Sequence, residues 1–113
     1  MDFQPHSVDQ VVLVLSNAPD ESVAKRIAHV VIEEALAACV NLGPPSLSMY
    51  MWQDTLEGAT EVPLTFKTTG ARVMGLMERI KSLHPYEVPE ILVIPVIAGL
   101  DSYVNWVKEQ TST

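Results

Sequence analysis

One stretch decides the fold, and residues 11–42 spell it as VVLVLSNAPDESVAKRIAHVVIEEALAACVNL. Its first five residues, 11–15, form a continuous apolar and mostly β-branched run, which is typical of a strand buried on both faces. Asp20 predicts the start of a helix, because its carboxylate can accept the free backbone N–H groups of a first turn. From Val23 onward apolar residues recur at helical spacing, and the helix is expected to run to about Ala38.

The next segments predict a long hairpin. A strand is expected near Cys39, where the sequence is CVNL; the tripeptide GPP interrupts it, and it resumes as SLSMYMWQ. The segment EVPLTFKTT alternates apolar and polar residues and predicts a third strand, joined to the second by a polar turn around Gly58. Pro63 has no N–H to give to a ladder of hydrogen bonds, so we expect it at a bulge or facing an edge.

The rest of the chain predicts a helix, a strand and a second short helix. The Thr-Gly pair at 69–70 opens a helix whose apolar residues recur on one stripe. It is expected to stop before Pro85, because the residue before a proline is biased away from helical geometry. The segment EILVIPVI, residues 90–97, predicts the last strand, and Asp101 or Ser102 is expected to cap the terminal helix. The order β-α-β-β-α-β plus a C-terminal helix predicts an α+β protein with the ferredoxin-like split βαβ arrangement and a long hairpin between its second and third strands.

Length and composition bound the remaining possibilities. The 113 residues suit one domain, expected over residues 11–110 behind a flexible N-terminal tail at residues 1–10. Apolar residues make up 48% and charged residues 19%, which excludes a disordered chain. A net charge of −7 is repelled by phosphate backbones and anionic membrane surfaces, so we expect neither nucleic acid nor membrane as partner. The N-terminus lacks the basic start and apolar core of a signal peptide, which predicts a cytoplasmic location.

Motifs for catalysis are missing from the sequence. It contains no G-x-S-x-G, no P-loop, no G-x-G-x-x-G and no H-E-x-x-H. The single cysteine, Cys39, excludes an internal disulfide, and its apolar neighbours favour a packed thiol over a nucleophile. The histidines are scattered and none pairs with another at i, i+4 spacing. We therefore predict that the protein is not an enzyme and requires no cofactor.

One loop gathers several polar side chains. In SLHPYEVPE, residues 82–90, an imidazole at His84 lies near a phenol at Tyr86 and carboxylates at Glu87 and Glu90. Such a set can line a polar cleft that binds a ligand. The alternative is a rigid turn fixed by the two prolines, with the tyrosine packed inward.

Four aromatic residues form a second unusual group: Tyr50, Trp52, Tyr103 and Trp106. Tyr50 and Trp52 are two residues apart and therefore share a strand face, and Trp106 lies on a terminal helix too short to be stable alone. This much aromatic surface outside the central strands favours an interface between subunits. The alternative is a cluster beneath the chain's own terminal helix.

Several stretches together resemble one known family. They are APDESVAKRIAHVVIEEALAACVNL (18–42), SMYMW (48–52), FKTT (66–69), HPYEVPEILVIPV (84–96) and YVNWV (103–107). They follow in order along nearly the whole chain, which thereby resembles the CutA family of divalent-cation tolerance proteins. The resemblance implies a ferredoxin-like fold and a tight homotrimer, in which long hairpin strands pair between subunits and C-terminal helices brace the joins.

The metal ligands that the resemblance implies are only partly present. Members described as copper-binding carry a cysteine in the first strand and paired histidines before the P-Y motif, whereas this sequence has Ser16 and Leu83 at two of those positions. A hydroxyl and an isobutyl group cannot replace a thiolate and an imidazole as soft ligands. His84 is the one ligand left, and we expect weak binding of copper or another divalent cation there.

The predicted function is a trimeric protein of divalent metal ion (copper) tolerance, with clefts between subunits that bind a metal ion or a small ligand. The predicted cleft residues are Lys67, His84, Tyr86 and Glu90, and the predicted interface residues are Tyr50, Trp52, Tyr103 and Trp106. The alternative is a non-catalytic structural or signalling trimer that binds a protein partner.

Overall fold

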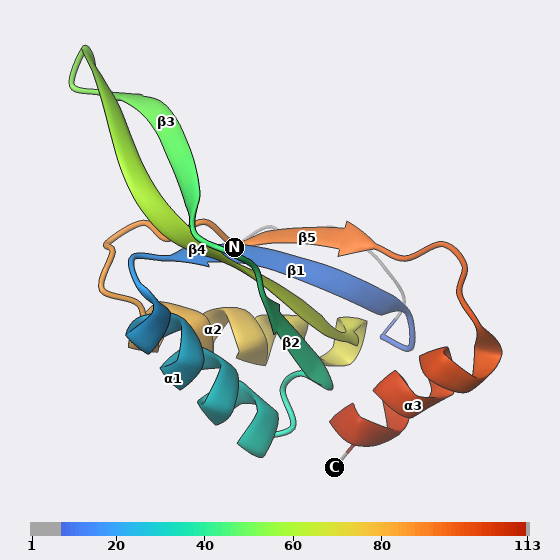
Figure 1. Ribbon diagram of the computed structural model, residues 1–113. Coiled ribbons are helices and arrows are strands. Elements are labelled where there is room, and N and C mark those ends of the chain that lie inside the picture. Colours follow the sequence, from blue (N-terminus) through green and yellow to red (C-terminus); the bar gives the residue numbers. More distant parts are fainter. Residues whose placement is uncertain (1–7, 113) are drawn as a thin grey trace.

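The computed structural model describes residues 8–112, which fold into an antiparallel sheet with helices around it (Figure 1). Its elements are β1 (Val11–Ala18), α1 (Glu21–Glu33), β2 (Cys39–Leu42), β3 (Ser46–Trp52), β4 (Thr55–Thr69), a 3-10 turn (Gly70–Arg72), α2 (Val73–Leu83), β5 (Leu92–Pro95) and α3 (Asp101–Thr111). The predicted tail at residues 1–10 falls mostly outside the described residues. The element order matches the prediction.

The sheet has the strand order β2-β4-β1-β5, and β3 pairs with the other part of β4. Every pairing is antiparallel: β1 lies between β4 and β5, while β4 pairs first with β3 and then with β2. Helix α1 connects β1 to β2 and helix α2 connects β4 to β5, and in each case the two strands are separated in the sheet by another strand. This is the split βαβ arrangement of ferredoxin-like folds. The predicted fold class is confirmed.

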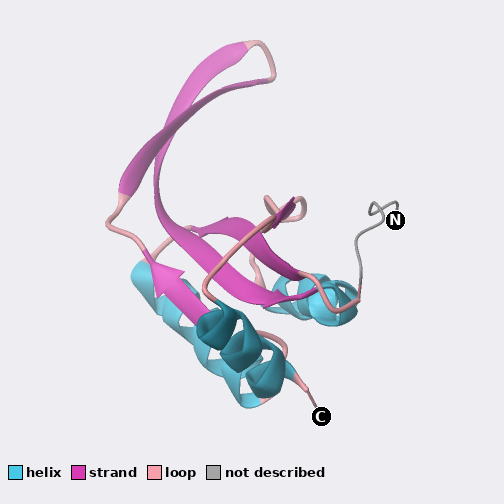
Figure 2. Ribbon diagram, turned by 90° about the vertical axis from the view of Figure 1, so that its right-hand side faces the viewer, coloured by secondary structure: helices cyan, strands magenta, loops and turns pink. Residues whose placement is uncertain are grey.

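The hydrophobic core lies between the sheet and the helices α1 and α2, which cover one face (Figure 2). Alternate strand residues such as Val14 and Phe66 point into this core and are fully buried, as period-two strand geometry requires. Ile27 of α1 and Ile80 of α2 meet them from the helix side and are also fully buried. The predicted apolar stripes of both helices are therefore the core-facing stripes.

Helix α1 begins as predicted and ends earlier than predicted. Asp20 caps it, with its carboxylate accepting the Val23 N–H at 2.8 Å. The helix stops at Glu33 instead of about Ala38, because Ala35 adopts a left-handed backbone with φ of 56°. The N–H groups of Ala35 and Leu36 return to the carbonyls of Ile32 and Val31, which is a Schellman ending. Glycine usually occupies the left-handed position at the end of a helix, so an alanine at this position did not indicate the end of α1 in the sequence.

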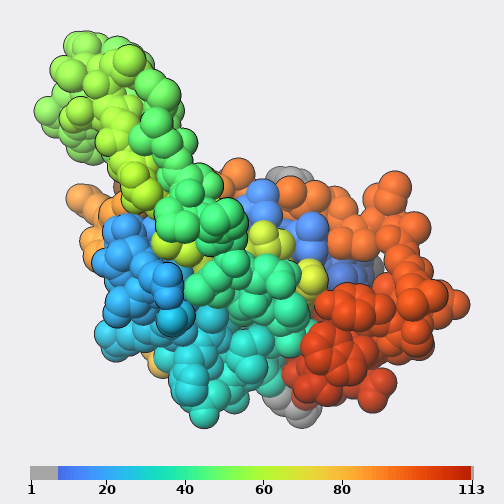
Figure 3. Space-filling view, in the orientation of Figure 1, coloured from blue at the N-terminus to red at the C-terminus, as the bar shows by residue number. Residues whose placement is uncertain are grey.

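The hairpin turn also differs from the prediction. It is formed by Gln53 and Asp54, whose φ angles of 48° and 65° suit a tight two-residue turn, and not by the region around Gly58. Gly58 lies inside β4, opposite Met49. Strand β4 is consequently 15 residues long, and its first part forms with β3 a two-stranded projection that we call the arm, residues 46–60. The arm stands away from the rest of the molecule (Figure 3).

Pro63 lies within β4 opposite Asn17, and the register with β1 continues past it without a bulge. Its carbonyl accepts the Gly43 N–H at 3.0 Å, so its nitrogen faces the same neighbour. There β2 has ended at Leu42 and β3 has not yet begun. Pro63 therefore lacks its N–H at a position between the end of β2 and the start of β3. The proline ring lies very close to Gly43, because a Cβ at Gly43 would be only 2.8 Å from it.

The strand and the helix predicted for the C-terminal part are present, but the bounds of the strand and the cap of the helix differ from the prediction. Strand β5 covers four residues instead of the predicted 90–97. Neither Asp101 nor Ser102 caps α3; the N-cap residue is Leu100, and its side chain makes no capping bond. Helix α3 packs where β4 ends, with Arg72 Nε donating to the Thr111 carbonyl at 2.6 Å. Within residues 8–112, no helix is long and apolar enough to cross a membrane.

Candidate functional site

Five polar residues meet where the arm joins the body of the molecule. They are Asn17, Glu61, His84, Tyr86 and Glu90, and we call them the His84 cluster. Asn17 comes from the end of β1 and Glu61 from β4, while the other three lie in or beside the loop between α2 and β5. The structure thus brings together three of the four predicted cleft residues.

His84 is held in one orientation by the backbone. It follows the last residue of α2 and has extended geometry, as expected for a residue before a proline. Its Nε2 lies 2.6 Å from the Asn17 carbonyl oxygen, and its Nδ1 accepts the Tyr86 N–H at 3.1 Å. Because a carbonyl only accepts, Nε2 must carry the hydrogen and Nδ1 the lone pair. The ring is therefore a neutral imidazole, 7% exposed, with both nitrogens bonded.

Tyr86 links the loop to the base of the arm. Its hydroxyl donates to Glu61 Oε2 at 3.0 Å, and its ring lies 4.6 Å from the His84 ring, measured between centroids. Burial and, next, the bond to the Glu61 carboxylate raise the pKa of Tyr86 above its ordinary value of 10.0. Both influences favour the protonated phenol, which is the form that can donate to the carboxylate.

Asn17 joins the loop to β1 from the other side. Its amide nitrogen donates to Glu90 Oε1 at 2.9 Å, while its backbone carbonyl holds His84. Glu90 is exposed, whereas Glu61 at the far end of the cluster is 9% exposed. A line of hydrogen bonds thus runs from Glu90 to Glu61 and fixes the loop against two strands. The alternative of a tyrosine packed inward is wrong in this respect, because Tyr86 is 39% exposed and its hydroxyl is bonded to Glu61. The loop is held by hydrogen bonds and also presents carboxylates and a phenol.

The cluster has no arrangement for nucleophilic catalysis among the described residues. His84 would need a free nitrogen to act as a base, and its Nδ1 lone pair is already bonded to a backbone N–H. Cys39, the single thiol, lies in β2, where it is paired with Lys67 rather than with the cluster. The geometry is suited to holding a loop and binding a polar ligand at its edge.

The residues at the copper-ligand positions that the resemblance implies do not fit a tightly bound copper ion. Ser16 is 2% exposed, and its hydroxyl has no hydrogen-bond partner among the described residues. Leu83 packs against the hydrophobic core. His84 would have to release the Tyr86 N–H before Nδ1 could ligate a metal. Across residues 8–112, no three His, Cys, Asp or Glu side chains are grouped as a metal site, and weak binding at His84 stays a prediction.

Lys67, the fourth predicted cleft residue, lies apart from the cluster. In β4 it is four residues beyond Pro63, which pairs with Asn17, so it lies about 13 Å farther along the strand. Its Nζ lies 5.7 Å from the centroid of the Tyr103 ring, a cation–π contact with α3. Lys67 can join the cluster only as a residue of a neighbouring copy.

The predicted interface residues occupy two separate places. Tyr50 and Trp52 lie on the arm, where they are 45% and 60% exposed. Tyr103 and Trp106 lie on α3 with their ring centroids 5.5 Å apart, and both remain partly exposed. Figure 1 shows the arm and α3 at opposite ends of the molecule. A single cluster of all four beneath the terminal helix is therefore excluded within one chain.

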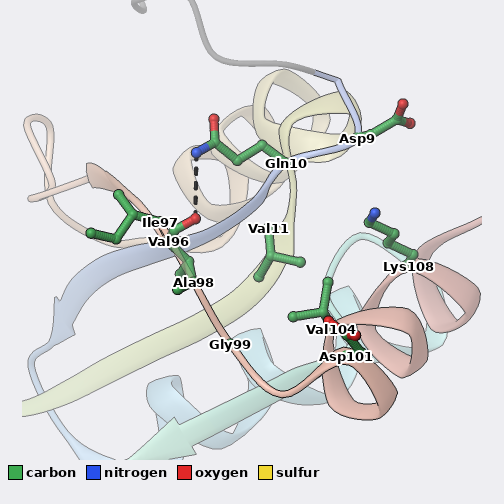
Figure 4. Close-up of a pocket in the computed structure, with 10 residues that line it drawn as sticks. All are labelled: Asp9, Gln10, Val11, Val96, Ile97, Ala98, Gly99, Asp101, Val104 and Lys108. Atoms are coloured by element: carbon green, nitrogen blue, oxygen red, sulfur yellow. Dashed lines mark hydrogen bonds between the residues drawn. The ribbon is translucent and has the colours of Figure 1, made fainter.

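A shallow hollow of about 460 Å³ lies at the other end of β1 (Figure 4). The start of β1, the loop after β5 and α3 line it, with mainly apolar and backbone groups inside and Lys108 and two aspartates at its rim. Gln10 bridges two of these segments by donating to the Val96 carbonyl at 3.4 Å. Val11 lies six residues from Asn17, about 20 Å along the strand, so this hollow is distinct from the His84 cluster.

The sequence analysis missed Asn17 and Glu61. Both lie in strands, far along the chain from the loop that they bind. Each is a polar residue at the edge of an apolar strand segment, and Glu61 directly precedes the buried Val62. A polar side chain at such a place is an indication of a buried hydrogen-bonding partner.

Residues 12–110 match the family described as CutA1 divalent ion tolerance protein. The chain belongs to this family. Its sequence is 43% identical over 105 residues to the divalent-cation tolerance protein CutA of Citrobacter koseri, covering 93% of this chain and 91% of the relative. It is 44% identical over 99 residues to the CutA protein of Thermus thermophilus, covering 88% of this chain and 96% of that one.

Solved structures of the family confirm the fold. The CutA crystal structure from Xylella fastidiosa matches with a TM-score of 0.90 and 36% identity, covering 91% of this chain and 99% of that chain. An Archaeoglobus fulgidus structure described as a periplasmic divalent cation tolerance protein CutA matches with a TM-score of 0.88 and 32% identity, covering 90% and 99%. The ferredoxin-like arrangement is therefore shared with solved members of the family.

Proposed function

We propose that the protein is a non-catalytic homotrimer of divalent-cation response, which binds a small polar ligand or, weakly, a metal ion in clefts between its subunits. The observation that supports it most is the arm. Within residues 8–112 it is a two-stranded ribbon with large apolar side chains exposed to solvent: Leu47, Met49, Tyr50, Met51, Trp52 and Leu56.

An assembly accounts for these exposed edges. The described strands leave the outer edges of β3 and β5 unpaired, and an unpaired apolar edge promotes aggregation unless another chain covers it. Leu92 and Ile94 on β5 are 56% and 43% exposed, which makes that edge apolar as well. A head-to-tail contact that turns by a third of a circle covers every such edge in a closed ring.

The ligand is proposed to bind beside the His84 cluster because of its place in the chain. Glu61 lies at the base of the arm and is bonded to Tyr86, so a neighbour that packs on the arm comes close to the cluster. Lys67 of that neighbour can then face Glu90, which keeps the predicted cleft set together. The exposed carboxylate of Glu90 and the phenol of Tyr86 favour a polar or cationic ligand.

Two measurements test the proposal. Sedimentation equilibrium at micromolar concentration is expected to give three times the chain mass of 12.4 kDa, and a 12.4 kDa species would contradict it. Thermal unfolding with Cu²⁺, Zn²⁺ or small anions is then expected to show a raised melting temperature for at least one of them, because a ligand that prefers the native state stabilises it. The Glu90→Gln variant is expected to lose that rise, and Glu87→Gln is the matched control.

The same experiments distinguish the proposed ligand-binding trimer from the alternative function. An intact trimer whose melting temperature responds to none of these ligands supports a structural or signalling trimer with a protein partner. We also propose a cytoplasmic location, since a free thiol at Cys39 suits a reducing compartment. Fractionation of cells expressing the tagged protein tests this, and recovery from the periplasm, the location in the description of the A. fulgidus relative, would contradict it.

A further inference from the structure

The hollow at the start of β1 is separate from the surfaces that the proposed trimer covers. Its lining from α3 includes Lys108, whereas the proposed interface uses Tyr103 and Trp106 of the same helix. At 3.6 residues per turn, Lys108 lies about 140° around the helix from Tyr103 and about 160° from Trp106. The wall formed by residues 96–99 lies beyond the last residue of β5. The hollow is therefore expected to stay open when a neighbour packs on the arm or on the edge of β5.

The walls of the hollow are fixed to one another. The Val96 N–H donates to the Val11 carbonyl at 3.1 Å, and the Gln10 amide donates to the Val96 carbonyl at 3.4 Å. The loop after β5 also packs against α3, because a Cβ at Gly99 would lie 3.0 Å from Val104 Cγ2. The volume of about 460 Å³ is within the range of small-molecule sites. The hollow is therefore formed before any ligand binds.

Two opposite charges on α3 flank an apolar surface in this hollow. Asp101 and Lys108 are seven residues apart, so they share one side of the helix with Val104 between them. The Lys108 side chain extends from α3 toward the start of β1 (Figure 4). Neither charged side chain makes a hydrogen bond or an ion pair with another described residue, whereas Lys25 and Arg79 are paired with glutamates. Both charges are therefore available to a ligand.

The ligand that fits these groups carries both charges and an aliphatic part. The net charge of −7 disfavours an anion, whereas a zwitterion has no net charge to be repelled. Helical side chains lean toward the N-terminus of their helix, so Lys108 reaches back over Val104 toward Asp101. We propose that the hollow binds a free amino acid with an aliphatic side chain. Its carboxylate meets Lys108, its ammonium group meets Asp101, and its side chain lies against Val11 and Val104.

The test uses L-leucine as probe and the full chain. Titration calorimetry is expected to show one saturable site per chain. Isocaproate, which lacks the ammonium group, and isoamylamine, which lacks the carboxylate, are each expected to bind about tenfold more weakly or less, because each loses one charge-assisted contact. In amide NMR spectra, L-leucine is expected to shift the resonances of Gly99 and Val104, which adjoin the hollow, and to leave that of Tyr86 in the His84 cluster unchanged.

Substitutions that remove one charge and keep the shape provide the matched variants. Lys108→Gln and Asp101→Asn are each expected to weaken L-leucine binding about tenfold, because each removes one charged partner. The controls are Lys81→Gln on α2 and Glu109→Gln on α3, two exposed residues outside the hollow, and both are expected to bind like the parent.

Three results would overturn the proposal. They are the absence of a saturable response to L-leucine at Gly99 and Val104 in the parent, equal binding of isocaproate and L-leucine, and unchanged binding in both Lys108→Gln and Asp101→Asn. The hollow involves neither the trimer contacts nor the His84 cluster. Sedimentation and the Glu90→Gln variant measure those separately, so a failure here is distinguishable from a failure of the proposed function.

Discussion

Strand β4 passes through two different environments. Residues 55–60 lie in the arm and are almost all exposed, whereas residues 61–69 lie in the body and alternate between buried and half-buried positions. In the body, the core supplied by α1 and α2 holds the strand in place. In the arm, only β3 pairs with it, and a lone two-stranded ribbon is marginally stable in water. The body carries its own stability, and we propose that the arm gains its stability from a neighbouring copy.

Removing a large core side chain should damage the body most. Phe66→Ala deletes a fully buried ring from the centre of the sheet and is expected to lower the free energy of unfolding by about 3–5 kcal/mol. Urea unfolding followed by circular dichroism measures the loss. A change below about 1 kcal/mol would mean that the core does not depend on this ring.

The corresponding change in the arm should act on assembly. Trp52→Ala removes an exposed ring that the proposed interface covers, and is expected to weaken association by about 2 kcal/mol or more while the circular dichroism of the body persists. Sedimentation velocity over a concentration series gives the shift. Ile32→Ala is the control, since this residue is an apolar side chain 41% exposed on α1, in the body. If both variants associate as strongly as each other, Trp52 is not an interface residue.

A backbone change in the body should give a smaller, stabilising effect. Ala35→Gly relieves the left-handed geometry that ends α1 and is expected to raise the free energy of unfolding by about 1 kcal/mol. The control is Ala38→Gly, at a position without positive φ, where the same change is expected to destabilise the protein. If both variants behave alike in urea unfolding, the Schellman ending is not the cause.

The smallest effect concerns the link between the two regions. The raised pKa of Tyr86 means that its contribution to stability is present below pH 10.0 and is lost as the pH rises through the folded-state value. Tyrosinate absorbance, compared with that of Tyr86→Phe, is expected to show Tyr86 ionising above the ordinary range. Glu61→Gln should lower this pKa, and Glu57→Gln, on the arm, should leave it unchanged. An unaltered titration in Glu61→Gln would exclude the carboxylate as a cause.

The sequence predicted those elements whose signals are local and periodic. The apolar run at 11–15, the cap at Asp20 and the stripe of α2 were enough for the fold class. Two boundaries were wrong because an unusual residue took a left-handed position: Ala35 in place of glycine, and Gln53 with Asp54 in place of a turn at Gly58.

Within the candidate site, the sequence predicted only the residues that lie in or beside the loop between α2 and β5. His84, Tyr86 and Glu90 lie within seven residues, and their polar character was visible in the sequence. Asn17 and Glu61 reach the cluster through strand pairing, which no local pattern indicates. Lys67 was predicted to line the cleft, and one chain alone does not bring it there.

Amide hydrogen exchange of β3 tests most directly whether the arm depends on a second copy. Alternate β3 residues direct their N–H groups away from β4, toward the outer edge that no described strand covers. At micromolar concentration these amides are expected to exchange as slowly as those of β1 in the body, because a neighbouring chain bonds them. Exchange of these outer amides at the rate of free peptide, while β1 stays protected, would contradict the account.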